Sequence, residues 1–326
     1  MSDSMVHASA VSWPRFPSLE KLIIQKAQGL TNFVIHSESL LNVVLKSLKG
    51  LLQLDVVAPA LAALCVLRCF ADASARSHPV ARISAPNLEI LRWSDAFDLS
   101  SVQFDKMENL QLLGPLGTSY FYVYGEEGYN QDCLRLLQHF QFDAIPGLRL
   151  KLVYLPDIIN REYLMEDMTV LPDIVFLILT VMANGHCIGP SLFHVLRKCT
   201  GVRRLKLALR SSDYLEAEAE CKSCICDLPP NWTSEQLVLN SLHEVKITHL
   251  RGTKHENGFC EAAIQLGTWA AMLKEVTINF CGSITESTAK ELCQMLLSFT
   301  SREIILKFRV GHGSHMVFFP KTNVHH

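Results

Sequence analysis

The sequence lacks a strong surplus of either charge. Its 326 residues carry 30 lysines and arginines against 32 aspartates and glutamates, which gives a formal net charge of −2 and a pI near 6.7. Proteins that bind nucleic acid or anionic membranes through charge show a clear basic patch or stripe. We therefore expect neither nucleic acid nor a membrane as a partner.

Signals for export or membrane insertion are also missing. Met1–Ser12 has no basic start followed by an apolar run, so no signal peptide is expected. The most apolar runs are Leu51–Ala71, which contains polar residues, and Ile174–Met182, which is too short to span a bilayer. Both are typical of buried strands. We expect a soluble protein of the cytoplasm or the nucleus.

Loops that bind phosphate or carry a nucleophile are not found either. Gly114–Thr118 lacks the lysine of a P-loop, and Gly311–His315 has its serine in the wrong place for a nucleophile elbow. The adjacent carboxylates of Glu126 and Glu127 are expected to be solvated, because a catalytic carboxylate needs a pocket that shifts its pKa. We expect no catalytic residue, no cofactor and no enzymatic activity.

The sequence does contain a short leucine-rich phrase, repeated five times between Leu19 and Val66. The copies follow the pattern L-x-x-L-x-Φ, with Φ apolar, and their central anchors are evenly spaced: Leu22, Phe33, Val43, Leu54 and Leu64. Local alternation predicts short strands, and a fixed period predicts a repeat architecture. Two phrases make about 21 residues, a normal coil length for leucine-rich repeats. We expect successive phrases to alternate between the concave sheet and the convex back of a solenoid.

The phrase continues less regularly after the fifth copy. Phe70–Pro86 is small and polar, and we expect it to be an inserted loop. The pattern resumes at Leu88-Leu91-Trp93 and Leu99-Val102-Phe104, with a weaker match at Met107-Leu110-Leu112. The aromatic run Tyr120–Tyr124 favours a strand that closes this half.

From about Asn130 the spacing changes to strand plus helix. Gln131–Phe142 has helical spacing. Strand anchors then follow at longer intervals, with one step longer than the rest: Leu148, Leu177, Leu205, Val245, Val276 and Ile304. Helices are expected between them at Ile158–Met168, Pro190–Lys198, Glu256–Leu273 and Glu286–Phe299. Pro190 suits a first helical turn, and Thr285 suits an N-cap.

Together these patterns predict an α/β fold, a curved leucine-rich-repeat solenoid with short strands in the first half and strand–helix coils in the second half. Five segments are expected along the chain. They are a flexible N-terminus (1–13), the leucine-rich-repeat region (14–210), an acidic and cysteine-rich insertion (211–236), a C-terminal strand–helix region (237–310) and a flexible tail (311–326).

The insertion holds the best candidates for metal or redox chemistry, Cys221, Cys224 and Cys226. Zinc needs about four thiolate or imidazole ligands in tetrahedral geometry. The residues that could complete such a set are His249, His255 and Cys260. No second C-x-x-C stands at zinc-ribbon spacing, so we expect a reduced loop without metal. The tail histidines are expected to be exposed, and they are His312, His315, His325 and His326.

One part of the sequence resembles a known family. Asp227–Phe308 contains DLPPNWTSEQLVLNSLHEVKITHLRGTKHE, LGTWAAMLKEVTINF and ITESTAKELCQMLLSF. These segments resemble the FBD-type C-terminal region of plant F-box/leucine-rich-repeat proteins. The upstream segments SLEKLIIQ and APNLEILRW are similar to the leucine-rich region of that family. The resemblance covers roughly Phe16 to Phe308.

Members of that family are substrate receptors of SCF-type cullin–RING ubiquitin ligases. Their repeats capture a target protein, and an N-terminal F-box holds the Skp adaptor. The resemblance thus implies a protein target for this chain. Fewer than twenty residues precede the first repeat, and they contain no F-box-like Leu-Pro start. We therefore expect no direct binding of the Skp adaptor.

Partner-binding residues are expected on the strand faces opposite the buried anchors, because side chains alternate along a strand. The concave sheet is the usual binding surface of a solenoid. The candidates are the polar residues beside the anchors: Arg92, Arg204, Lys206, Glu244, Lys246, Glu275 and Thr277. As a set they form a mixed-charge surface suited to a protein or a peptide.

The sequence therefore predicts a non-catalytic protein-recognition module that resembles the substrate-receptor part of an SCF-type F-box protein, without the F-box. Two alternatives stay open. One is a zinc or redox protein that uses the Cys221–Cys226 loop, and metal content and thiol pKa would distinguish it. The other is a truncated product with no partner, which an exposed apolar N-terminal edge would favour.

Overall fold

The computed structural model describes residues 9–12, 15–70, 80–114, 120–158, 160–210, 237–252, 270–299, 304–309 and 316–318. The chain divides into two compact units. The first unit runs to Tyr120 and also includes Asn130–Arg149, whereas the second consists of Phe121–Tyr129 and the residues from Leu150 onward. Among the helices that are described, none has the length and apolar character needed to cross a membrane.

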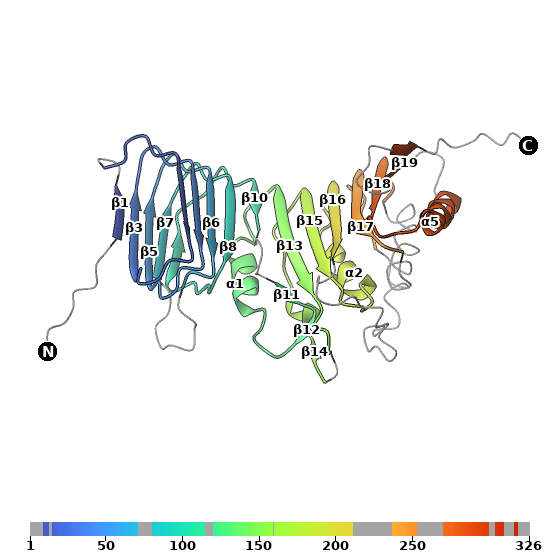
Figure 1. Ribbon diagram of the computed structural model, residues 1–326, viewed down its shortest axis with the longest axis horizontal. Helices are drawn as coiled ribbons and strands as arrows, with labels where there is room; N and C mark the ends of the chain where they lie inside the picture. Colours follow the sequence, from blue (N-terminus) through green and yellow to red (C-terminus); the bar gives the residue numbers. More distant parts are fainter. Residues whose placement is uncertain are drawn as a thin grey trace, which may run out of the picture. The chain divides into compact units, whose positions relative to one another are not determined.

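The first unit contains two parallel sheets of short strands, and Figure 1 shows successive strands next to one another. One sheet has the order β1 (Ser9–Ser12), β3 (Asn32–His36), β5 (Gln53–Val57), β7 (Val80–Ser84) and β9 (Val102–Phe104). The other has the order β2 (Lys21–Gln25), β4 (Asn42–Lys46), β6 (Ala63–Leu67), β8 (Ile90–Ser94), β10 (Leu112–Leu113) and the first residues of β13 (Gly147–Val153). Successive leucine-rich phrases lie in different sheets, which confirms their predicted alternation.

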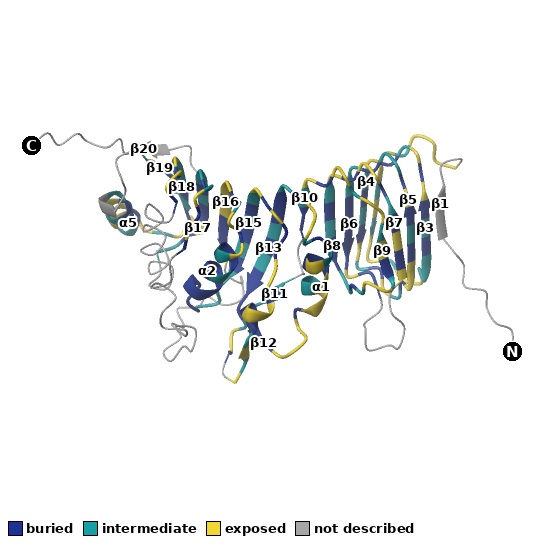
Figure 2. Cartoon of the chain, turned by 180° about the vertical axis from the view of Figure 1, so that it is seen from behind, coloured by how far each residue is buried: buried dark blue, intermediate teal, exposed yellow. Residues whose placement is uncertain are grey.

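The phrase anchors form the core of this unit. Val43, Leu64 and Leu91 lie opposite one another on neighbouring strands and are fully buried. In the other sheet, Phe33 lies opposite Leu54 and Ile35 lies opposite Val56, and all four are buried. The residues between the anchors are more exposed, so the strands in Figure 2 are banded. Period-2 alternation therefore buries one side of each strand, as the sequence predicts.

The corners of the coils repeat as regularly as the strands. Lys26, Ser47 and Arg68 each follow a strand of the second sheet at a constant interval, and each has φ near +50°. The backbone N–H of each donates to the coil that follows, with N···O distances of 2.8–3.0 Å. Gly29 and Gly50 take a second positive φ shortly after the first two of these corners. One coil of about 21 residues is therefore the structural repeat.

The prediction that Phe70–Pro86 is a loop is wrong for part of this range. Val80–Ser84 forms β7, which pairs in parallel with β5 and β9. Ala81 and Ile83 fill the two anchor positions and are buried. This strand has no leucine, and a small alanine replaces the usual large anchor, so the sequence shows no phrase here. Residues 71–79 lie outside the described part of the chain.

Helix α1 (Gln131–His139) covers aromatic side chains of the first unit. Its Asp132 Oδ1 accepts a hydrogen bond of 3.0 Å from the Phe97 backbone N–H. Phe104 contacts Phe97, Trp93 and Phe140, with ring centroids 5.3–5.9 Å apart. The predicted helix over Gln131–Phe142 is confirmed, although it ends at His139.

The second unit is built on a single longer sheet. Its strand order is β13, β15 (Phe176–Met182), β16 (Arg204–Arg210), β17 (Glu244–Leu250), β18 (Glu275–Phe280), β19 (Ile305–Arg309) and β20 (Met316–Phe318). Strands β15 to β19 are parallel, and β20 is antiparallel to β19. The shorter strands are β11 (Phe121–Tyr122), which pairs with β13, and the antiparallel pair β12 (Tyr124–Gly125) and β14 (Glu162–Tyr163).

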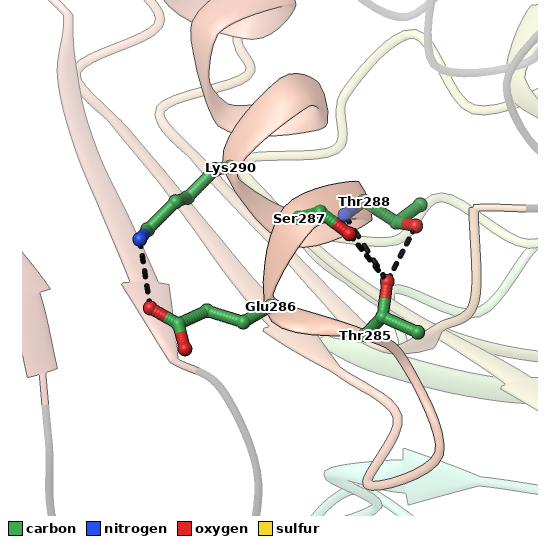
Figure 3. Close-up of polar contacts among 5 residues, drawn as sticks. All are labelled: Thr285, Glu286, Ser287, Thr288 and Lys290. Carbon is green, nitrogen blue, oxygen red and sulfur yellow. Dashed lines mark hydrogen bonds and ion pairs between the residues drawn. The ribbon is translucent and has the colours of Figure 1, made fainter.

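Helices follow two of these strands, as predicted. Helix α2 (Gly189–Arg197) has Pro190 in its first turn and buries Leu192, Phe193 and Leu196. Helix α5 (Glu286–Phe299) begins after Thr285, whose Oγ1 accepts a 3.2 Å hydrogen bond from the Thr288 N–H (Figure 3). This bond satisfies an N–H of the first turn that has no partner within the helix. The predicted cap is therefore confirmed.

Two predictions for this unit are wrong. Ile158–Met168 forms strand β14 and a 3₁₀ helix (Leu164–Asp167) instead of an α-helix. The Leu164 N–H donates to Val123 O, which lies outside this segment, and so does not form the hydrogen bond that an α-helix would need. In β19, Leu306 rather than Ile304 lies opposite Val276. At the two ends of the chain, β1 and β20 lie within the segments 1–13 and 311–326, which the sequence predicts to be flexible.

Candidate functional site

Six of the seven predicted partner-binding residues lie together on one face of the sheet in the second unit. Strand registers align them in two rows that run across β15 to β19. The first row consists of Phe176, Arg204, Glu244, Glu275 and Ile305. The second row consists of Ile178, Lys206, Lys246, Thr277 and Lys307. We call these two rows, with Arg210 and Arg309 farther along β16 and β19, the outer face.

The alternation of β16 explains why these residues share a side. Leu205, Leu207 and Leu209 are at most 4% exposed and point into the core. Arg204 and Lys206, which stand between them, are exposed. Because every neighbouring strand is parallel and in register, the same side of each strand contributes to the outer face. The alternation of side chains along each strand therefore produces one continuous surface across β15 to β19.

The outer face carries more positive than negative charge, although the whole chain has a net charge of −2. Its only carboxylates among the described residues are Glu244 and Glu275. Its cations are Arg204, Lys206, Arg210, Lys246, Lys307 and Arg309. Burial lowers the pKa of Lys151 on β13, and the charge of Arg210 lowers it further. That repulsion is consistent with a positive potential at this face.

Glu275 is partly neutralised by its neighbours. Its Oε2 lies 2.7 Å from Lys307 Nζ, and its Oε1 accepts a 3.2 Å hydrogen bond from Thr277 Oγ1. The hydrogen bond from Lys307 lowers the pKa of Glu275. Thr277 is only 8% exposed, so it positions Glu275 through this hydrogen bond and offers little surface to a partner. By contrast, Arg204, Lys206 and Lys246 form no ion pair with any described residue.

Arg204 is held in place by an aromatic ring. Its guanidinium carbon lies 4.9 Å from the centroid of the Phe176 ring on the neighbouring strand. A cation over a ring face is attracted by the ring quadrupole, and this contact leaves the N–H donors of the guanidinium available for an acceptor. Phe176 and Ile178 are half-buried, so the rows combine charges with apolar surface.

The seventh predicted residue, Arg92, lies in the first unit. It stands on β8 opposite Cys65, on the outer side of the sheet. The structure therefore does not place it among the other six residues. Burial raises the pKa of the Cys65 thiol, and the nearby charges of Arg92 and Lys46 oppose this shift.

The sequence interpretation missed three cations of the outer face: Arg210, Lys307 and Arg309. Arg210 lies four residues after the candidate Lys206 on β16. Lys307 and Arg309 lie two and four residues after Ile305, the residue opposite the candidate Glu275. The same alternation could therefore have identified all three. Alignment of the predicted anchors Val276 and Ile304 would place Lys307 opposite Asn279, whereas the structure places it opposite Thr277. The sequence therefore gives no indication of its contact with Glu275.

The thiols of the described chain offer little nucleophilic chemistry. Cys65, Cys69, Cys187, Cys199 and Cys293 are buried and form no disulfide among the described residues. Burial raises the pKa of Cys199 to about 12 and that of Cys69 to about 11. At half-buried Cys281 the hydrogen bond from Ser283, with Oγ and Sγ 3.4 Å apart, lowers the pKa of the thiol.

The predicted cysteine and histidine cluster falls outside the described residues. This holds for Cys221, Cys224, Cys226, His255, Cys260 and the four tail histidines. His249 lies on β17 with a left-handed φ of 64°. Over the ranges that are described, no group of three or more potential metal ligands comes together. The zinc and redox alternatives thus stay predictions.

Comparison with known proteins yields no match to this chain, whether to a protein-family model, a curated protein or a solved structure. The candidate site is therefore defined by its geometry and by the sequence.

Proposed function

We propose that this chain is a non-catalytic protein-recognition module that binds an acidic protein or peptide on the outer face. The part of the sequence that resembles plant F-box/leucine-rich-repeat proteins favours the same role, the substrate-receptor part of an SCF-type ubiquitin ligase. In such a role the chain selects a target and performs no bond chemistry itself.

One observation carries the proposal. The outer face presents the cations of two in-register rows, and Arg204, Lys206 and Lys246 form no ion pair within the described chain. Surface charges with no partner attract a complementary surface and set both its orientation and its rate of association. Half-buried Phe176 and Ile178 add apolar area beside them.

The register also suggests how a partner would lie. Neighbouring parallel strands are about 4.8 Å apart, so Lys206 and Lys246 are one strand apart, whereas Thr277 on β18 separates Lys246 from Lys307. An extended acidic segment that crosses the strands would meet Lys206, Lys246 and Lys307 in turn. Glu244 and Glu275 in the adjacent row would disfavour a second acidic segment beside it.

Selection from a displayed peptide library tests this proposal, and it requires no assumption about which protein binds. We expect the wild-type chain to enrich acidic peptides, and we expect their affinity to fall as salt rises. The Lys206→Glu variant should weaken the selected peptides at least tenfold. Because Lys206 lies opposite Lys246, this change replaces a like-charge pair by an opposite pair and should not damage folding.

Lys198→Glu is the matched control. Lys198 follows helix α2 and is exposed, so the same charge reversal occurs away from the rows. The proposal fails if no acidic peptide is enriched, or if Lys206→Glu and Lys198→Glu weaken binding equally.

A further inference from the structure

Two arginines of the first unit stand in one row across three strands. Leu113 of β10 lies opposite both Leu91 of β8 and Leu148 of β13. The next residue along each strand is Gly114 for β10, Arg92 for β8 and Arg149 for β13. The Gly114 N–H donates a 2.9 Å hydrogen bond to Leu91 O, so the parallel register continues to this row. Only a glycine therefore separates the two arginines.

Gly114 lets Arg149 approach closely. A Cβ at position 114 would lie 2.6 Å from Arg149 Cβ and 3.1 Å from Arg149 O. Any other residue would therefore push Arg149 away. Strands two positions apart in a sheet are separated by about 9.6 Å, which two arginine side chains can span together. The arrangement brings two guanidinium groups to the same side of the sheet.

These two guanidinium groups have no acceptor in the described chain. The Nε atoms of Arg92 and Arg149 are both buried without a hydrogen-bond partner there. Neither arginine forms an ion pair with a described carboxylate. Burial lowers the pKa of Arg149, and the charge of Arg92 lowers it further, so the two groups repel each other. Lys46 is a third cation close enough to act on Cys65, which lies opposite Arg92.

Buried donors without acceptors and two like charges that repel each other are costly unless an anion offsets them. We propose that Arg92 and Arg149 form a binding site for an oxyanion with a charge near −2, namely a phosphate monoester. Guanidinium forks match the oxygens of phosphate in paired hydrogen bonds, and two positive charges match the charge of about −1.5 to −2 that such a group carries at neutral pH. A single carboxylate would neutralise only one of the two arginines.

This site does not depend on the proposed function, because it uses residues of the first unit only. It also needs no partner protein for its test. Failure of the peptide selection would leave the phosphate site intact, and failure of phosphate binding would leave recognition by the outer face intact.

Titration calorimetry with inorganic phosphate is the first test. We expect saturable binding by the full chain, and Arg92→Gln and Arg149→Gln should each weaken it at least tenfold. Arg82→Gln is the matched control, because Arg82 is an exposed arginine of the same unit on β7 and should leave the affinity unchanged. Equal affinities for the wild type, Arg92→Gln and Arg149→Gln would refute the site.

Thermal unfolding separates loss of binding from loss of folding. Phosphate should raise the Tm of the wild type and of Arg82→Gln, since a ligand that binds only the native state stabilises it. Both site variants should keep or exceed the wild-type Tm without phosphate, because each change removes a buried Nε donor that has no acceptor and ends the repulsion between the two guanidinium groups. Acetate at the same concentration should produce no shift, and an equal shift with acetate would contradict selectivity for a dianion.

Two further ligands distinguish the source of the phosphoryl group. A phosphoserine peptide that binds at least tenfold more tightly than inorganic phosphate, and loses that advantage in Arg149→Gln, would assign the site to a phosphorylated protein. Equal affinities for the peptide and for inorganic phosphate would assign it to small phosphate esters.

Discussion

In the first unit the coils from β1 to β9 each contain two strands, whereas in the second unit strands β15 and β18 are followed by helices. The two-strand coil is short, with about 21 residues, and its buried anchors form a core between the two sheets. The second unit uses longer connections between successive strands from β15 to β19 and places α2 and α5 in them. Its strands are also longer. Longer strands hold more outward positions, and the outer face is accordingly found in the second unit.

The units also differ in their polar interior. In the first, the half-buried Asp95 accepts backbone hydrogen bonds from Cys69, Phe70 and Ala96. In the second, Tyr154 and Ser191 join the end of β13 to α2 by a buried hydrogen bond of 2.7 Å between hydroxyl groups. A carboxyl group thus fixes a corner of the first unit, while a hydroxyl pair fixes a helix of the second. This difference gives the two units different expected responses to pH and to mutation.

The largest expected effect tests whether both sheets of the first unit carry the core. Ile83→Ala should lower the free energy of unfolding by about 2–5 kcal/mol, because it empties a fully buried position of β7. Leu207→Ala in the second unit should cost a similar amount. Urea unfolding measures both. Arg82→Ala on the same strand should change the value by no more than about 0.5 kcal/mol. If Ile83→Ala behaved like Arg82→Ala, β7 would not be part of the core.

The second-largest expected effect is a pH dependence of the free energy of unfolding that arises from Asp95 in the first unit. Burial raises the pKa of Asp95 from 3.8 to about 6. A raised native pKa means that the stabilisation is complete below about pH 4 and is lost as the pH rises through about 6. The expected loss is on the order of 2 kcal/mol between pH 4 and pH 7. Urea unfolding across this range should show a flatter profile for Asp95→Asn than for the wild type. Parallel profiles for the two proteins would contradict this assignment.

A smaller effect tests the strand–helix contact of the second unit. Tyr154→Phe should destabilise the chain by about 1 kcal/mol, since it removes one partner of a buried hydroxyl pair. Ser191 keeps its 3.2 Å hydrogen bond to Ile188 O, which limits the cost. Hydrogen exchange of the α2 amides is the appropriate measurement. Exchange that accelerates equally in β4 would show that the effect is not confined to the second unit.

The smallest effect concerns the cap of α5. Thr285→Ala should cost up to about 1 kcal/mol, because the Thr288 N–H loses its acceptor (Figure 3). Ser287→Ala removes only a hydroxyl that lies 3.1 Å from Thr285 Oγ1 and leaves the cap in place. Thermal unfolding should therefore rank Thr285→Ala below Ser287→Ala, and equal Tm values would argue against the cap.

Periodic features of this molecule can be predicted from the sequence. The spacing of Leu22, Phe33, Val43 and Leu54 is enough to assign alternate phrases to different sheets, because a parallel ladder repeats the same environment in every coil. The same argument places Arg204 and its neighbours in the rows on one face. Position along a strand sets the side on which a residue lies.

Features that depend on contacts between distant residues could not be predicted. Ala81 gives no sign of an anchor, since its role depends on the large residues around it. The hydrogen bond of Thr277 depends on how Lys307 of another strand holds Glu275. Arg92 and Arg149 are far apart in the sequence, and their juxtaposition follows from Gly114 and the register of β10. No local pattern marks any of these.

The even spacing of the corners at Lys26, Ser47 and Arg68 has a consequence for how such a chain can change in evolution. Duplication or loss of one whole coil shifts every later strand by one place and keeps it in its own sheet. An insertion of half a coil would exchange the two sheets for every strand that follows. A gene segment that encodes one whole coil is therefore the natural unit of growth for the first half of this protein, and its length should vary in those steps.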